Sequence, residues 1–174
     1  PGLAFFYGGM VNKKNVISTI LQSFIAMGII SVVWVIVGFS LAFGDNIGGV
    51  LGNPATFFMF HGVGAKVNPE LAPTIPLALY ALFQMKFAII TPSLITGAFA
   101  ERVKFSAYLV FMILFCLFIY CPLAHCTWHP DGIFRQWGVV DFAGGIVVHA
   151  SSGIAALAGA LFLGKRVKDK RSDA

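Results

Sequence analysis

Long apolar stretches dominate the chain, and short polar segments separate them. The four longest stretches each reach the length of about 20 residues that an α-helix needs to cross a bilayer. Their residues do not alternate between apolar and polar, so spanning helices are favoured over the strands of a membrane barrel. The predicted spans are residues 16–43, 74–100, 105–126 and 142–164. Residues 2–11 predict the end of one further helix, which we expect to begin before Pro1.

The polar segments between the predicted helices differ in length and charge. Residues 12–15 and 101–104 are tight charged turns. Residues 45–73, which are rich in Gly, Pro and Asn, and residues 128–141 are longer loops. If successive helices alternate in direction, both tight turns and the tail at 165–174 lie on the same side of the membrane.

The basic residues are distributed unequally between the two predicted sides. The side of the tight turns carries nine Lys and Arg residues, whereas the opposite side carries Lys66 and Arg135. Because basic residues collect in cytoplasmic loops, the tail at 165–174 is predicted to begin a cytoplasmic loop. The sequence therefore predicts an all-α polytopic protein of the cell (plasma or inner) membrane, with one transmembrane domain over residues 1–164.

The composition supports a membrane environment. Hydrophobic residues make up 58% of the 174 residues and charged residues 11%, whereas soluble chains carry about a quarter charged residues. A soluble domain of this size could not bury so much apolar surface. The net charge of +5 follows from the one-sided topology, and a patch for lipid phosphate or nucleic acid is the weaker alternative. Cys116, Cys121 and Cys126 lie five residues apart on one helix, which suits apolar fillers better than zinc or disulfides.

Polar residues inside the spans are candidates for function, because the membrane makes them costly. His149 lies about 10 Å along its helix from residue 142. A neutral imidazole at this depth can donate from one nitrogen and accept at the other, which suits a proton or a small hydrogen-bonding solute. The alternative is a core histidine bonded to a neighbouring helix. Helical spacing predicts one face of small residues around it, namely Asp141, Gly145, His149, Ser152, Ala156 and Gly159.

Five further residues each allow two interpretations. For Asp141 a structural role at a helix start is favoured over an electrostatic role toward a passing cation. Phe83 and Phe87 share a helix face, and spacing alone indicates packing rather than closure of a pore. Lys86 lies mid-span, where a lysine costs about 2.5–3.5 kcal/mol, and it either snorkels or pairs with a carboxylate. Trp128 belongs to an interfacial aromatic belt or offers a cation–π contact.

Three stretches resemble the ammonium transporter family (Amt/Mep/Rh), and together they extend over essentially the whole chain. PGLAFFYGGMV at 1–11, with KKNV at 13–16, is similar to the end of the family's first helix. FQMKF at 83–87, followed by AIIT and by GAFAER at 97–102, resembles the third helix. DFAGG at 141–145, followed by His149 and SSG at 151–153, resembles the fifth.

The resemblance implies a fold of eleven helices in two inverted five-helix halves, of which this chain is the first. It implies a homotrimer with one pore per subunit. Phe83 and Trp128 would form an outer site that recruits ammonium, and Phe87 would be one ring of a phenylalanine gate. His149 would be the first of two pore histidines, and Asp141 the buried acid that supports the outer site.

The expected function is transport of ammonium or ammonia, and of methylammonium as a further candidate, through a hydrophobic, histidine-lined pore. Lys86 stands where the family leads us to expect an uncharged residue, which keeps open an ammonium sensor on the same scaffold. An enzyme with His149 as base and Ser152 as nucleophile is disfavoured, because no oxyanion donor is evident. His125 and His149 lie at different depths, which disfavours haem. No cofactor, metal or nucleic-acid partner is expected, and any cytoplasmic regulatory protein is left open.

Overall fold

The computed structural model describes residues 1–165, which are mostly helical. Within this part, four helices are long and apolar enough to cross a membrane, and they correspond to the four predicted spans. They run over Lys13–Phe43, Leu77–Phe99, Phe105–Gln136 and Gly145–Leu163. The short helix α1 (Gly2–Gly8) matches the predicted helix end. The chain is therefore a multi-pass membrane protein, and most of the predicted cytoplasmic tail, residues 166–174, lies outside the described residues.

Each span is built from shorter helical segments. The first contains η1 (Lys13–Asn15), α2 (Val16–Val33), η2 (Trp34–Gly38) and α3 (Phe39–Phe43). The second contains α4 (Leu77–Leu94) and α5 (Thr96–Phe99). The third contains α6 (Phe105–Phe115), η4 (Cys116–Tyr120), α7 (Cys121–Trp128) and α8 (Ile133–Gln136). The fourth contains η5 (Gly145–Ala150) and α9 (Ser151–Leu163). The segments η2, η4 and η5 are π-helical turns, which are frequent at functional sites.

The third span was predicted to end at residue 126, whereas α7 continues to Trp128 and α8, within the predicted loop at 128–141, extends the helical region to Gln136. Two predicted span starts are also wrong, and backbone constraints explain both. Residues 74–76 belong to strand β4 (Ala72–Pro76), because a residue before proline avoids the helical region and α4 begins directly after Pro76. Residues 142–144 precede the fourth span, because Gly144 has a φ of 91°. This left-handed conformation cannot continue a right-handed helix.

The two predicted loops contain short regular elements that their composition did not reveal. In the first loop β1 (Asn46–Ile47) pairs with β2 (Leu51–Gly52), and β3 (Val67–Asn68) pairs with β4, both antiparallel. The turn η3 (Phe58–Phe60) lies between these hairpins, and α8 lies in the second loop. β1, β2 and β3 have only two residues each, which is too short to show the alternation by which sequence patterns identify strands.

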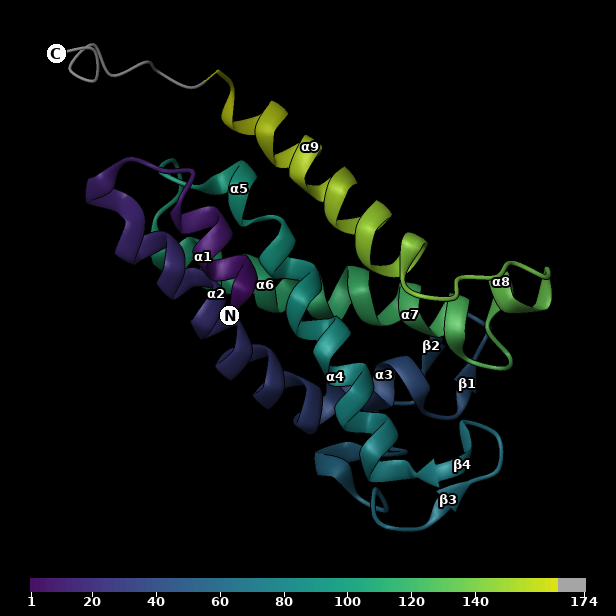
Figure 1. The fold of residues 1–174 in the computed structure, drawn as a ribbon. Coiled ribbons are helices and arrows are strands. Elements are labelled where there is room, and N and C mark those ends of the chain that lie inside the picture. Colours follow the sequence, from purple (N-terminus) through teal and green to yellow (C-terminus); the bar gives the residue numbers. More distant parts are fainter. Residues whose placement is uncertain (166–174) are drawn as a thin grey trace, which may run out of the picture.

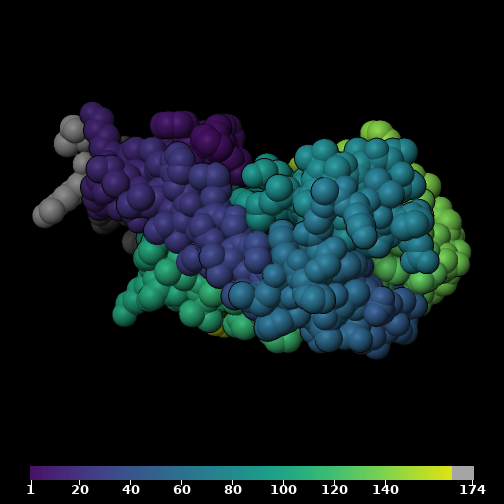
Figure 2. Space-filling model, turned by 90° about the horizontal axis from the view of Figure 1, so that it is seen from below, coloured from purple at the N-terminus to yellow at the C-terminus, as the bar shows by residue number. Residues whose placement is uncertain are grey.

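The charged turns and the long loops lie at opposite ends of the molecule. The turn before α2, the connection between α5 and α6, and the end of α9 gather at one end (Figure 1). The strands and α8 lie at the other end. Seen from below, the segment at 44–76 covers this second end and the turn at 12–15 lies far from it (Figure 2). The helices therefore alternate in direction, whereas the side that faces the cytoplasm stays a prediction.

Aromatic packing joins the first span to the second and third. The Trp34 ring lies 6.2 Å from the Tyr120 ring, measured between centroids, and its Nε1 donates to the Ala81 carbonyl oxygen at 3.0 Å. Trp34 and Tyr120 are both fully buried. The three cysteines are buried free thiols, as predicted for apolar fillers.

A glycine and an arginine fix the end of α9 against the second span. A Cβ on Gly159 would collide with the ring of Phe99, so this ring packs directly against the backbone of α9 there. The guanidinium of Arg102 donates to the carbonyl oxygens of Ala98 at 2.6 Å and Gly164 at 2.7 Å. The side chain of Arg102 thus joins the second span to the end of α9 by binding a backbone carbonyl oxygen of each.

We predict that Gly159→Ala destabilises the protein by about 1–3 kcal/mol, because the added methyl group overpacks the contact with Phe99. Gly153→Ala is the matched control, since a Cβ at this position of the same helix meets nothing within 4 Å. The measurement is thermal unfolding of the full-length protein in detergent. Equal losses of stability in both variants would contradict the close contact at Gly159.

Candidate functional site

Three aromatic side chains from two spans meet near the end of the molecule that carries the long loops. Phe83 and Phe87 project from α4 with ring centroids 5.0 Å apart and planes at 80°. Phe87 also contacts Trp128, the last residue of α7, with centroids 5.8 Å apart and planes at 60°. We call these three residues the aromatic cluster. The structure thus brings together the three residues that the sequence predicts for an outer cation site and gate.

The aromatic cluster combines packed rings with an accessible one. Phe83 is 54% exposed, whereas Phe87 and Trp128 are half-buried. A cation within about 6 Å of a ring centroid is attracted by the negative face of the ring, and the gain grows from about 0.5–1 kcal/mol at exposed sites to about 2 kcal/mol where water is removed. The cluster can therefore bind a small cation that gives up part of its water.

The position of Trp128 is fixed by the segment that precedes the last span. Its indole Nε1 donates to the backbone carbonyl oxygen of Asp141 at 2.8 Å. The ring also packs next to Gly144, where a Cβ would lie 3.8 Å from Trp128 Cζ2. Gly144 adopts the left-handed conformation that favours glycine. No role was predicted for Gly144, although the pair of glycines at 144–145, where the span begins, was the available signal.

The side chain of Asp141 accepts four backbone N–H bonds at the start of the last span. Its Oδ1 accepts from Gly144 and Gly145 at 2.8 Å, and its Oδ2 accepts from Ile146 and Val147 at 3.0 Å. Burial alone would raise the pKa of this carboxyl, but the four N–H donors outweigh it and hold the pKa below its ordinary value. Asp141 is thus ionised at neutral pH and pairs N–H groups that a helix start leaves without partners.

His149 lies in η5 and is exposed in the described chain, whereas Ser152, three residues later, is only 5% exposed. Their exposures therefore differ, and the expectation that they share one face stays a prediction. The turn η5 is π-helical, and its i→i+5 bonds put more residues into each turn than an α-helix has. The α-helical spacing on which the expectation relied is therefore not followed over residues 145–150.

The hydroxyl of Ser152 donates to the backbone carbonyl oxygen of His149 at 3.2 Å. Ser151 bonds in the same way to the carbonyl oxygen of Val147 at 2.5 Å. Both hydroxyls thus satisfy carbonyls of their own helix, which is a common use of serine within helices. This geometry gives no support to His149 as a base that activates Ser152.

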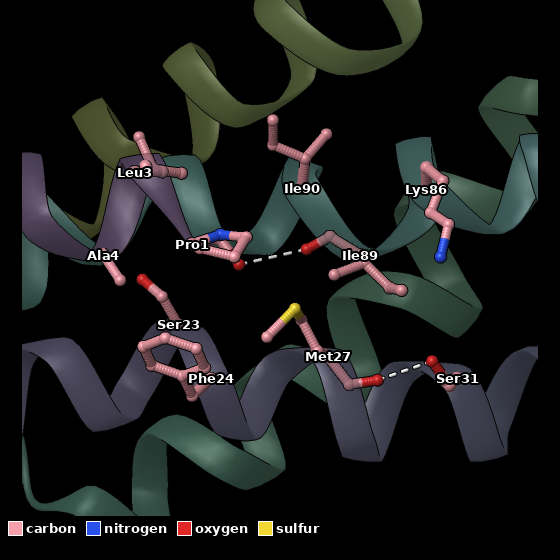
Figure 3. Close-up of a pocket in the computed structure, with 12 residues that line it drawn as sticks. Pro1, Leu3, Ala4, Ser23, Phe24, Met27, Ser31, Lys86, Ile89 and Ile90 are labelled. Carbon is pink, nitrogen blue, oxygen red and sulfur yellow. Dashed lines mark hydrogen bonds between the residues drawn. The ribbon is translucent and has the colours of Figure 1, made fainter.

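Lys86 lines a different surface of α4 from the aromatic cluster, although it lies between Phe83 and Phe87 in the sequence. Its side chain extends into a cavity of about 340 Å³ between α1, α2 and α4 (Figure 3). Ser23 and Ser31 contribute polar atoms to this cavity, whereas neither Phe83 nor Phe87 lines it. The positive charge that the sequence placed beside the two rings is therefore turned toward another part of the molecule.

Two further histidines form a stacked pair at the end of the third span. The buried His125 contacts the Ala42 carbonyl oxygen through Nδ1 and Asn46 Oδ1 through Nε2, both at 3.0 Å. The His129 ring stacks on it at a centroid distance of 4.3 Å, and its Nδ1 accepts from the Asp131 N–H at 3.1 Å. These contacts hold the loop end of the first span against α7. Within residues 1–165, no group of three or more His, Cys, Asp or Glu side chains could hold a metal ion.

Known proteins share both the sequence and the arrangement of helices. The family model described as the Ammonium Transporter Family matches residues 1–174. An ammonium transporter of Bacillus subtilis is 48% identical over 168 residues, which are 95% of this chain and 40% of that protein. A crystal structure of a Candida albicans Mep2 mutant has a TM-score of 0.86 and 36% identity, over 95% of this chain and 36% of that one. A structure described as a sensor Amt protein has a TM-score of 0.84 and 30% identity, over 99% and 42%.

This chain spans about two fifths of the length of the curated relatives that it matches, with 39% to 41% of the first of them covered. The likeness therefore applies to the described spans and to the residues that they carry. It does not extend to whatever the relatives form with the rest of their length.

We predict that Asp141→Asn lowers the free energy of unfolding by about 1.5–3 kcal/mol at neutral pH, because an amide cannot accept all four N–H bonds. The pKa of Asp141 is lower in the folded chain than in the unfolded chain. The stabilisation by Asp141 is therefore complete above the pKa of about 3.9 that an aspartate has in the unfolded chain, and it is lost as the pH falls through the lower pKa of the folded chain. The gap in unfolding midpoint between wild type and variant should narrow below about pH 4.

The measurement is unfolding in detergent over a series of acidic buffers. Glu70→Gln removes an exposed carboxylate of the loop and is the control for the change of net charge. If the gap for Asp141→Asn stayed constant down to about pH 3, the carboxylate would not be the stabilising group.

Proposed function

The chain belongs to the ammonium transporter family, and we propose that it supplies the cation-recruiting half of a pore for ammonium or ammonia. The observation that carries this proposal is the aromatic cluster, in which the Trp128 ring is held in place by Asp141. The end of the molecule with the long loops, near the cluster, is proposed to face the outside of the cell membrane. The reason is that the basic turns lie at the opposite end.

Recruitment begins at Phe83 and Trp128. Ammonium exchanges part of its hydration shell for the faces of these rings, and cation–π attraction favours the cation over water and neutral ammonia. Phe87 lies one helical turn further along α4 and contacts both other rings, so it is placed to act as a gate. Beyond this ring a hydrophobic path makes the charged form costly, so ammonium releases its proton, to water or along a separate path, and the solute proceeds as neutral ammonia.

His149 is the proposed pore residue beyond the gate. Its imidazole is exposed on η5, which leaves it available to face a path completed by other parts of a longer protein. A histidine can relay protons near neutral pH, because its ordinary pKa lies close to that range. Methylammonium as a second solute and a homotrimer with one pore per subunit are further parts of this proposal, and they rest on the family resemblance.

An ammonium sensor on the same scaffold is the second candidate function. It is favoured by the likeness to the structure described as a sensor Amt protein. A sensor would bind the cation at the aromatic cluster without efficient conduction. The complete gene separates the two functions, because a sensor requires a signalling domain beyond the membrane spans.

Cells that express the full-length gene should take up labelled methylammonium. Trp128→Leu should raise the half-saturating concentration roughly 2- to 30-fold, which corresponds to a loss of about 0.5–2 kcal/mol of cation–π attraction. Trp128→Phe keeps a ring and should retain most of the affinity. His149→Ala should instead lower the maximal rate of uptake.

The matched control is Trp137→Leu, because Trp137 is 69% exposed in the segment after α8 and lies outside the aromatic cluster. Amounts of protein in the membrane are compared by immunoblotting. Absence of uptake in the wild type, together with no effect of His149→Ala, would remove the transport proposal.

Lys86→Met should change the half-saturating concentration less than about twofold, which corresponds to about 0.4 kcal/mol. The reason is that Lys86 lines the cavity beside α1 and α2 rather than the surface of the rings. The same uptake assay measures this effect, with wild type at matched expression as reference. A tenfold gain in apparent affinity would mean that the lysine charge repels ammonium at the recruitment site.

A further inference from the structure

The proposed pathway does not use His125, although this buried residue lies about one turn before Trp128 on α7. Its ring joins α7 to the end of the first span. Nδ1 lies 3.0 Å from the Ala42 carbonyl oxygen, and Nε2 lies 3.0 Å from Asn46 Oδ1. The elements that carry these oxygens, α3 and β1, lie at the same end of the molecule as α7 (Figure 1). One imidazole ring thus anchors the end of α7 that carries Trp128.

Both ring nitrogens of His125 face oxygen atoms that can only accept hydrogen bonds. The amide of Asn46 presents its oxygen to the ring, because the same Oδ1 accepts from the Gly49 N–H at 2.7 Å. A neutral imidazole has one N–H, so it can donate to only one of the two oxygens, and the other contact then brings two lone pairs together in a buried site. The imidazolium has two N–H donors and satisfies both contacts.

The end of the first span favours the imidazolium, whereas burial of the ring opposes it. The Ala42 carbonyl lies in the last turn of the helix that ends at Phe43. Carbonyl groups in a last turn lack helical partners, and the negative end of the helix dipole stabilises a cation. The α3 segment itself, FSLAF, contributes no ionisable side chain.

The ionisable groups around His125 are a second histidine and three carboxylates. The stacked His129 ring is neutral, because its Nδ1 accepts from the Asp131 N–H. Asp131, Asp45 and Glu70 line one cavity with His129, so the formal charges around this cavity are negative. Their attraction for a cation offsets part of the desolvation of a charged ring. Opposing effects of this kind bring the two protonation states of His125 close in free energy.

We propose that His125 is a positioning residue for the recruitment site, and that its protonation fixes Trp128 in place. The imidazolium donates to both oxygens and fixes the end of α7 against α3 and β1. When the proton leaves, one of the two contacts becomes repulsive, and the Trp128 ring loses part of its support beside Phe87. This inference rests on the proposed function, because its consequence is a change in cation affinity at the aromatic cluster.

Low pH favours the state with both hydrogen bonds, and this state is lost as the pH rises through the titration of His125. The affinity for ammonium should therefore be higher at acidic pH than at basic pH. The expected difference is roughly 2- to 12-fold, which is the factor that one net hydrogen bond contributes.

The test is solid-state nitrogen NMR of the full-length protein with labelled histidine and tryptophan, from about pH 4 to about pH 8. Both ring nitrogens of His125 should be protonated at the acidic end, and the Trp128 indole signal should shift with the same midpoint. His125→Gln identifies the histidine signal and should make the Trp128 signal independent of pH. His61→Gln removes an exposed histidine of the long loop and, as the matched control, should leave both titrations unchanged.

A second variant changes the protonation without removing the ring. Asn46→Asp keeps an acceptor oxygen and adds a negative charge beside His125, so the midpoints of the His125 and Trp128 signals should both rise by about one pH unit or more. In the double variant Asn46→Asp, His125→Gln, the Trp128 signal should again be independent of pH.

Uptake of methylammonium into liposomes that contain the full-length protein measures the effect on function. This amine stays cationic over the pH range, as a lysine side chain does. The half-saturating concentration should rise with pH in the wild type, and the rise should move to higher pH in Asn46→Asp.

The two kinds of failure are distinguishable. If the His125 and Trp128 signals titrate together but uptake is absent, the positioning of Trp128 by His125 is supported and the transport proposal fails. Two results would overturn the inference. One is a His125 ring that stays neutral over the whole range in both the wild type and Asn46→Asp, and the other is a Trp128 signal that does not follow the protonation of His125.

Discussion

The ionised carboxylate of Asp141 sets the geometry at the start of the last span. A helix that starts near hydrocarbon leaves N–H groups without water to bind, and each such group costs several kcal/mol. Asp141 pairs four of them, and the same residue offers its backbone carbonyl oxygen to the indole of Trp128. The ring therefore takes its position from the helix start.

Length and hydropathy were sufficient to predict the four spans, because a bilayer imposes its thickness on every helix that crosses it. The contact between Phe83 and Phe87 was also predictable, since the two residues share one face of a regular α-helix. The π-helical turn at residues 145–150 was not predictable, because the pattern presumed α-helical spacing there. Hydrogen bonds between distant segments, such as that between Trp128 and Asp141, leave no periodic signal in a sequence either.

Lys86 shows that the direction in which a charged side chain points matters more than its place in the sequence. A charged side chain one residue from a ring can lie on a different side of the helix, because neighbouring residues differ by about 100° in direction. The cavity that receives Lys86 is also lined by Ser23 and Ser31, so it is not wholly apolar. The positive charge of Lys86 therefore lies within the protein but away from the rings of Phe83 and Phe87.

The last span is fixed at both ends through main-chain atoms. Asp141 binds N–H groups at its start, and Arg102 binds the Gly164 carbonyl oxygen after its end. Neither attachment uses the identity of the side chains that lie between. The outward residues of this helix can therefore change in evolution while the helix itself keeps its tilt and height.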